Sequence, residues 1–133
     1  MPESEPFVIY EADCEVETSA LHANPDVRWW TLVSADRRSS DGLTFGIAEV
    51  DPGEHREMRL HRHEPSEVYY ILSGEGFVHI EGRDYPVRPG ATVFIPGNAW
   101  HAAHNPGSEP LRLLYVFGVS SFDEVEYHFA EPS

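Results

Sequence analysis

The stretch HRHEPSEVYYILSG, residues 61–74, places two histidines, a glutamate and a final glycine within one short segment. His61 and His63 are two residues apart, so on a β-strand their side chains lie on the same face of the sheet. Glu67 follows beyond Pro65, where the chain is expected to bend. Two imidazoles and a carboxylate in this arrangement are typical ligands of a divalent transition metal.

A second stretch, GATVFIPGNAWHAAHN, residues 90–105, adds a further candidate ligand, His101, beside another turn. Three imidazoles and one carboxylate leave coordination positions for water or substrate, as in an expanded facial triad. The sequence therefore predicts one divalent metal per chain, held by His61, His63, Glu67 and His101. These ligands do not select among iron, manganese, nickel and zinc, because all four metals accept histidine and carboxylate.

The rest of the chain has the pattern of a small all-β protein. Turn dipeptides such as Pro52-Gly53, Glu81-Gly82 and Pro106-Gly107 recur along it. Short strands at such spacing predict an antiparallel sandwich or barrel with one domain, residues 27–133, after an acidic N-terminal segment, residues 1–26. We expect strands at residues 27–33, 43–50, 57–63, 67–73, 77–81, 92–95, 100–105 and 111–119.

Composition narrows the classes of protein further. The 133 residues suit one domain with one core. Lys plus Arg total 9 against 23 for Asp plus Glu, a net charge of −14, which repels phosphate backbones and argues against nucleic acid as a partner. The single cysteine, Cys14, cannot form an internal disulfide, and no segment has the pattern of a secretion signal or a transmembrane helix. We therefore expect a cytoplasmic protein that acts on a small molecule and binds no membrane.

The two stretches resemble the paired motifs of the cupin family. The motif His-x-His-x3-Glu-x6-Gly is matched in the first, and Gly-x5-Pro-x4-His-x3-Asn in the second, by His61, His63, Glu67, Gly74, Gly90, Pro96, His101 and Asn105. The resemblance implies a jelly-roll-like antiparallel β-barrel. Two departures lie in turns rather than among ligands: seven residues separate Gly53 from His61 where the family usually has five, and Asn98 replaces a glycine.

The alternative interpretation of the motif residues is a barrel that keeps them only for packing. Buried histidines and a glutamate without a metal would be costly, so we favour the metal site. The remaining histidines fit no motif and are expected at the surface or in supporting positions: His22, His55, His79, His104 and His128.

Strand parity adds one candidate for chemistry. If Glu67 points inward, Tyr69 and Ile71 point inward too, which brings Tyr69 near the open metal positions. A phenol beside a divalent cation has a lowered pKa and can act as a general base. On parity alone, an ordinary aromatic of the barrel interior is the better interpretation of Tyr69.

A second resemblance covers residues 26–129, which are similar to the short cupin-type dimethylsulfoniopropionate lyases of marine bacteria. The shared stretches are residues 27–29, 39–43, 61–69, 95–98 and 124–127. In that family two tyrosines are implicated in catalysis, and Tyr69 and Tyr127 occupy their places. The resemblance implies a metal-dependent carbon–sulfur lyase that cleaves dimethylsulfoniopropionate to dimethyl sulfide and acrylate by β-elimination.

A sulfonium is a cation on an apolar group and suits an aromatic wall. Trp29, Trp30 and Trp100 are the candidates, and Trp29 and Trp100 are taken as substrate-binding residues. Trp100 adjoins the ligand His101, although neighbouring residues of a strand face opposite ways. Core packing or a subunit contact would explain the tryptophans equally well.

Other functions remain open at this point. An iron-dependent dioxygenase would use the same ligands without needing Tyr69 or Tyr127, and a non-catalytic sensor or carbohydrate-binding cupin would show no turnover. A cofactor-free sugar epimerase is disfavoured, because it would not need the full ligand set. Small cupins are commonly dimers, so we expect a homodimer in which residues 7–10 cover or extend a neighbouring sheet.

Overall fold

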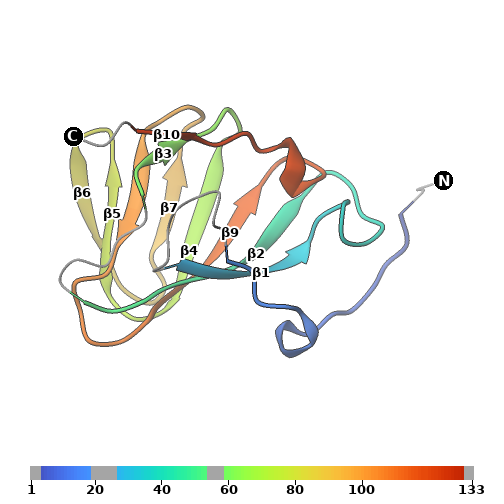
Figure 1. Ribbon diagram of the computed structural model, residues 1–133, viewed down its shortest axis with the longest axis horizontal. Coiled ribbons are helices and arrows are strands. Elements are labelled where there is room, and N and C mark those ends of the chain that lie inside the picture. Colours follow the sequence, from blue (N-terminus) through green and yellow to red (C-terminus); the bar gives the residue numbers. More distant parts are fainter. Residues whose placement is uncertain (1–3, 19–26, 54–58, 131–133) are drawn as a thin grey trace.

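The computed structural model describes residues 4–18, 27–53 and 59–130, and its strands form two antiparallel five-stranded sheets (Figure 1). In order across the first sheet lie β1 (Val27–Val33), β2 (Thr44–Val50), β9 (Leu111–Phe117), β4 (Glu67–Ser73) and β7 (Thr92–Ile95). In order across the second lie β10 (His128–Phe129), β3 (His61–Arg62), β8 (His101–His104), β5 (Gly76–Ile80) and β6 (Arg83–Val87).

Helical structure in the described ranges is limited to two single 3₁₀ turns, η1 (Glu11–Asp13) and η2 (Phe122–Glu124). The described residues form no helix that is long and apolar enough to cross a membrane.

Alternation along the strands builds the core between the sheets. In β9 every second side chain is buried, which points Leu111, Leu113, Tyr115 and Phe117 inward. In β4 the same parity buries Glu67, Tyr69 and Ile71. Burial of these apolar side chains favours folding. The same alternation brings the polar side chain of Glu67 into the interior beside them. The residues of the core that are fully buried include Val50, Ile71, Val78, Ile95, Leu111, Leu113 and Phe117.

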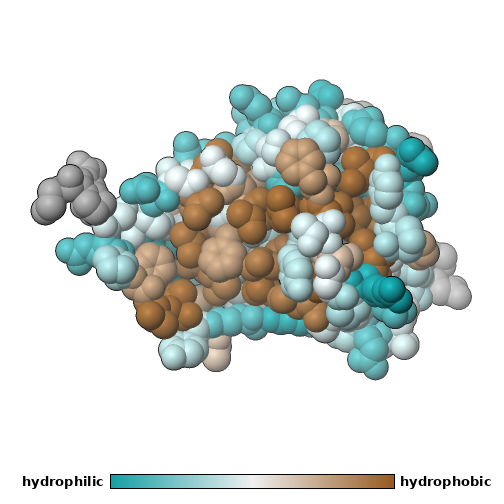
Figure 2. Space-filling view, turned by 180° about the vertical axis from the view of Figure 1, so that it is seen from behind, coloured by the Kyte–Doolittle hydropathy of each residue, from teal (hydrophilic) through white to brown (hydrophobic). Residues whose placement is uncertain are grey.

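The opposite parity gives the first sheet an apolar outer face. Tyr70 and Leu72 of β4 and Phe94 of β7 are exposed to 42%, 41% and 62%. Seen from behind, hydrophobic side chains gather across the middle of the molecule (Figure 2). An exposed apolar patch of this kind is typical of an interaction surface.

The predicted jelly-roll fold is confirmed, with one correction to the barrel. Among the described strands, hydrogen-bonded pairing stays within each sheet, so the two sheets do not form a closed barrel and meet through side chains instead. All eight predicted ranges contain a strand, but β6 and β10 were not predicted. Their signals are weak because β6 contains Pro86 and is exposed except at Val87, while β10 has only two residues.

Part of the N-terminal segment is fastened to the first sheet. Glu17 and Trp29 exchange two backbone hydrogen bonds of 2.7 and 3.0 Å, and the Arg112 guanidinium donates to the Glu11 carboxylate. Phe7, Val8 and Tyr10 are exposed, to 84% at Val8. Pairing of residues 7–10 with a second subunit stays a prediction.

Candidate functional site

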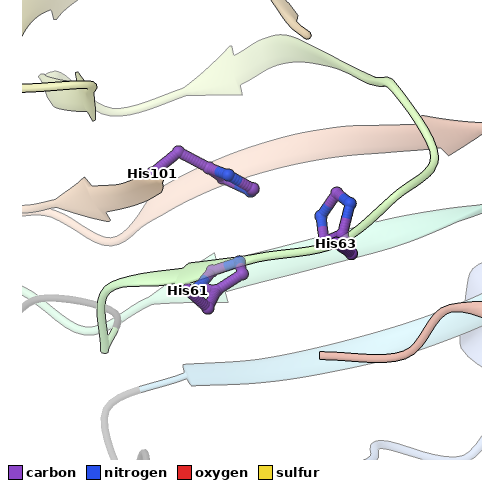
Figure 3. Close-up of side chains that lie close together, drawn as sticks. All are labelled: His61, His63 and His101. Carbon is purple, nitrogen blue, oxygen red and sulfur yellow. The ribbon is translucent and has the colours of Figure 1, made fainter. Parts of the chain in front are cut away.

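Three histidines from different parts of the sequence meet between the sheets. His61 lies in β3 directly opposite His101 in β8, and His63 follows on the loop after β3. All three are buried and their rings point toward one another (Figure 3). The ring centroids of His101 and the other two are 4.3 and 4.9 Å apart. One nitrogen from each ring lies within 4.8 Å of the others, so the group could hold a metal ion.

Backbone carbonyls fix the proton on each ring. The Nδ1–H groups of His61, His63 and His101 donate to the carbonyls of residues 59, 65 and 99 at 2.7, 2.8 and 2.9 Å. A carbonyl only accepts a hydrogen bond, so Nδ1 must carry the hydrogen. In a neutral ring, Nε2 then keeps its lone pair, which is the tautomer that binds a metal.

Glu67 completes a set of hydrogen-bond acceptors that face one another. Its Oε1 lies 3.1 Å from Nε2 of His63 and 3.2 Å from Nε2 of His101. A carboxylate oxygen and two nitrogen lone pairs repel one another unless a positive centre lies among them. The donor set therefore fits a divalent transition metal, for which imidazole and carboxylate are suitable ligands.

Burial and mutual contact set the charges of these groups. Burial, with a smaller effect of His101, lowers the pKa of His61 from 6.5 to about 3, so this imidazole is neutral near pH 7. Burial alone would raise the pKa of Glu67, but its contacts with His101 and His63 outweigh burial and hold the pKa below 4.5. A neutral imidazole and a charged carboxylate are the protonation states that metal binding requires.

Both predicted tyrosines lie beside the candidate metal ligands. Tyr69 is buried, with its ring 6.2 Å from that of His101, and the Tyr127 ring lies 5.3 Å from the rings of His61 and His63. Burial, reinforced by the charge of Glu67, raises the pKa of each phenol well above 10. The protein alone therefore opposes the low phenol pKa expected from the sequence. A base role for Tyr69 requires positive charge at the donor set.

The two tyrosines, His61 and Glu67 line one cavity, whose remaining wall is aromatic and aliphatic. Trp29 stacks on Phe122 with ring centroids 6.3 Å apart and planes inclined by 5°. The other lining residues are Val27, Ala48, Leu113, Tyr115 and Phe129.

Only one of the two tryptophans assigned to substrate lines this cavity. Trp29 is part of the wall, because its strand parity directs it inward. Trp100 does not line it; the Arg62 guanidinium lies 4.7 Å from the Trp100 ring centroid. The alternation of neighbouring residues explains this difference, since the inward direction is taken by His101.

The sequence interpretation missed three aromatic lining residues. Tyr115 alternates with Leu113 and Phe117 in a predicted strand, so the parity applied to Tyr69 could have identified it. Phe122 and Phe129 follow the last predicted strand, where no periodic pattern indicated their direction.

The histidines outside the motifs stay away from the centre. The His79 side chain is paired with Asp84 at 2.9 Å, His104 lies near the Phe77 ring, and His128 is an exposed residue near Glu126. His22 and His55 lie outside the described residues.

The unusual Asn98 supports the ligand loop. It adopts a left-handed conformation, φ 64°, in which glycine is the common residue and asparagine is tolerated. Its backbone N–H donates to the carbonyl of His63 at 2.7 Å. The preceding Gly97 packs so closely that a Cβ there would lie 2.3 Å from the carbonyl oxygen of Glu64. This turn therefore holds the loop that carries His63.

Residues 46–117, which include both histidine stretches, match the family model described as Cupin domain. The chain belongs to the cupin family. Over 104 residues this cupin is 40% identical to the dimethylsulfoniopropionate lyase DddW of Ruegeria pomeroyi, a match that covers 78% of the chain and 66% of the relative. It is also 34% identical over 86 residues to an oxalate-binding protein of Thermotoga maritima, covering 64% of the chain and 69% of the relative.

A solved structure supports the same fold. The polyketide cyclase RemF from Streptomyces resistomycificus superimposes with a TM-score of 0.81 at 20% sequence identity, covering 97% of this chain and 88% of the other. At this identity the likeness concerns the fold alone, and cupins differ widely in what they do. The function must therefore be argued from the cavity.

Proposed function

We propose that this cupin is a metal-dependent carbon–sulfur lyase that cleaves dimethylsulfoniopropionate to dimethyl sulfide and acrylate. The observation that carries the proposal is that Tyr69 and Tyr127 line the same cavity as His61 and Glu67. A general base, a metal centre and an apolar wall are the three parts that such an elimination needs. The 40% identity to a dimethylsulfoniopropionate lyase adds independent support.

The residues take distinct roles in this proposal. A divalent metal held by His61, His63, Glu67 and His101 would supply positive charge that acidifies the carbon beside the substrate carboxylate and favours the Tyr69 phenolate. The Tyr69 phenolate accepts the proton from that carbon. The C–H electron pair becomes the new C=C bond, and dimethyl sulfide leaves with the electrons of the C–S bond. Tyr69 finally returns its proton to water.

Tyr127 and Trp29 hold the substrate for this step. The Tyr127 ring packs against His61 and His63, and in this proposal its phenol donates a hydrogen bond to the substrate carboxylate. Trp29, backed by Phe122, offers an aromatic face to the sulfonium. The apolar wall also excludes water from the reacting carbon.

The direct test is a headspace assay for dimethyl sulfide with protein loaded with iron, manganese or nickel, together with detection of acrylate. We expect both products in equal amounts, and none from protein stripped by a chelator. Oxygen uptake is followed in the same vessel, because a dioxygenase would consume oxygen. Metal-loaded protein that binds dimethylsulfoniopropionate without releasing dimethyl sulfide would make it a binding protein and refute the lyase.

We further propose that the protein is a homodimer, and the apolar outer face of the first sheet supports this. Tyr70, Leu72 and Phe94 are exposed there. Contact of such an apolar face with water is unfavourable, and packing against a second copy of the chain would bury it. Light scattering is expected to give twice the 15.0 kDa mass of one chain. A 15.0 kDa particle at micromolar concentration would reject the dimer.

A further inference from the structure

A row of hydroxyl-bearing side chains crosses the inner face of the first sheet. The strand registers pair Thr31 with Gly46, Gly46 with Tyr115, and Tyr115 with Tyr69. All four positions face inward, because each follows the buried parity of its strand. Tyr115 is therefore the direct neighbour of the proposed base, on the side toward β1.

Gly46 makes room for the phenol of Tyr115. A Cβ at Gly46 would lie 2.6 Å from the Tyr115 hydroxyl oxygen and 2.3 Å from the carbonyl oxygen of Trp30. The Tyr115 ring thus extends over Gly46, and its phenol approaches the hydroxyl of Thr31. Thr31 and Tyr115 are exposed to only 3% and 4%, and apart from each other neither hydroxyl has a hydrogen-bond partner among the described residues. A buried hydroxyl left in this way calls for a partner that the described residues do not supply.

The surroundings of Tyr115 on the cavity side are aromatic and electron-rich, and the formal charges that act on its phenol besides Glu67 are those of Glu17 and Arg37, which form an ion pair with each other. Its ring lies 6.0 Å from that of Phe122, which also stacks on Trp29. Among the described residues that line the cavity, the one carboxylate is Glu67, and its oxygen faces His63 and His101 instead. Burial raises the pKa of Tyr115 well above 10, so its hydroxyl stays neutral near pH 7.

We propose that Tyr115 is a specificity residue whose hydroxyl oxygen contacts the cationic end of an onium carboxylate bound at the metal. The aromatic faces around it attract such a cation, and the phenol oxygen adds a directed dipole. The substrate class rests on the proposed lyase function. Because the sulfonium leaves as a neutral sulfide, this contact stabilises the bound substrate more than the transition state, and it acts on KM rather than on kcat.

The first test is Tyr115→Phe, which removes only the hydroxyl oxygen. We expect KM for dimethylsulfoniopropionate to rise about three- to tenfold, with kcat unchanged or slightly higher. Tyr85→Phe is the matched control, because Tyr85 is exposed in β6 and does not line the cavity, and it should change neither constant. A fall in kcat at constant KM would overturn the proposal.

The second test needs no turnover. Metal-loaded protein is titrated with 3-(trimethylammonio)propionate and with its neutral isostere 4,4-dimethylpentanoate. We expect wild-type protein to bind the cation more tightly than its neutral isostere. In Tyr115→Phe this preference should fall about three- to tenfold, because only the affinity for the cation is weakened. Equal weakening of both ligands would indicate a merely structural role, and no weakening of either would remove Tyr115 from the site. Both results overturn the proposal.

These two tests separate the inference from the function on which it rests. Protein that releases no dimethyl sulfide yet shows the expected loss of charge preference keeps Tyr115 as a cation contact and refutes the lyase. If Tyr115→Phe does not fold, Thr31→Val removes the hydroxyl behind the phenol and should reduce the same preference about twofold. An unchanged preference in a folded Thr31→Val variant then counts against the proposal.

Discussion

Polar side chains from β3 and its following loop, β4 and β8 converge where His61 and Glu67 line the cavity, its polar end, whereas Trp29, Tyr115 and Phe122 from β1, β9 and η2 line its aromatic end. The polar end is a set of acceptors in which Glu67 faces two imidazole nitrogens. The aromatic end has electron-rich surfaces and no carboxylate among its described residues. The first end requires a cation to be stable, and the second is suited to receive one from a ligand.

The comparison teaches how one small fold separates two tasks. Under the proposed function, activation belongs to the polar end, where the charged Glu67 is buried and each candidate ligand ring is held by a backbone carbonyl. Under the same proposal, recognition belongs to the aromatic end, where many weak contacts with aromatic side chains select the substrate. Substitutions at the first end should therefore abolish turnover, and those at the second should change affinity.

The largest effect is expected from the double substitution His61→Ala/His63→Ala. It removes two of the three imidazoles, so metal content should fall from about one per chain to near zero, and dimethyl sulfide release should fall to background. Elemental analysis on purified protein measures the first. Metal content equal to that of wild type would show that the polar end is not the metal centre.

A motif residue outside the cavity tests whether this loss is one of chemistry or of folding. The Asn105 amide donates to the carbonyls of Val50 and Glu109 at 3.0 and 2.8 Å and accepts from Gly107 at 3.1 Å. Asn105→Ala should lower the free energy of unfolding by about 2–4 kcal/mol, because buried backbone groups lose their partners. Denaturant titration measures this. Metal content should stay at the wild-type level, and metal loss from folded Asn105→Ala protein would contradict the separation.

Tyr127→Phe should have an intermediate effect, since this phenol bridges the two ends through its contacts with His61 and Phe122. Loss of one hydrogen bond to a carboxylate predicts a fall in kcat/KM of about 10- to 100-fold. Steady-state kinetics at matched metal content measures it. A variant as active as wild type would leave Tyr127 as a packing residue.

The smallest effect is expected at the aromatic end, where the two tryptophans form a matched pair. Trp29→Leu removes a cavity wall and should raise KM about three- to tenfold with little change in kcat. Trp100→Leu removes a ring that lies outside the cavity, beneath Arg62, and should leave KM unchanged. Equal effects of the two substitutions would contradict the assignment of recognition to this end.

The sequence predicts these two ends unequally, for a physical reason. Metal coordination demands particular donors at particular spacings, so His61, His63, Glu67 and His101 could be identified as a set before their geometry was known. Period-two alternation then directed Tyr69 inward correctly. An aromatic wall has no such demand, since any large apolar side chain that faces the cavity serves.

Two particular failures show where that information ends. Trp100 adjoins a ligand in sequence but faces away from it, and the alternation that explains this was already visible. Phe122 and Phe129 lie beyond the last predicted strand, and tertiary contacts with Trp29 and Tyr127 fix their places. The open edges of the two sheets were likewise missed, because strand pairing between distant segments leaves no local pattern.

The most direct test of the central claim compares wild-type protein with Tyr69→Phe in one experiment that records metal content and dimethyl sulfide release on the same samples. The substitution removes one oxygen and leaves the buried ring in place. We predict equal metal content, an unchanged fold by circular dichroism, and a fall in kcat of about 10²–10⁴-fold, the usual cost of a missing general base. Undiminished release of dimethyl sulfide by the metal-loaded Tyr69→Phe variant would contradict the account.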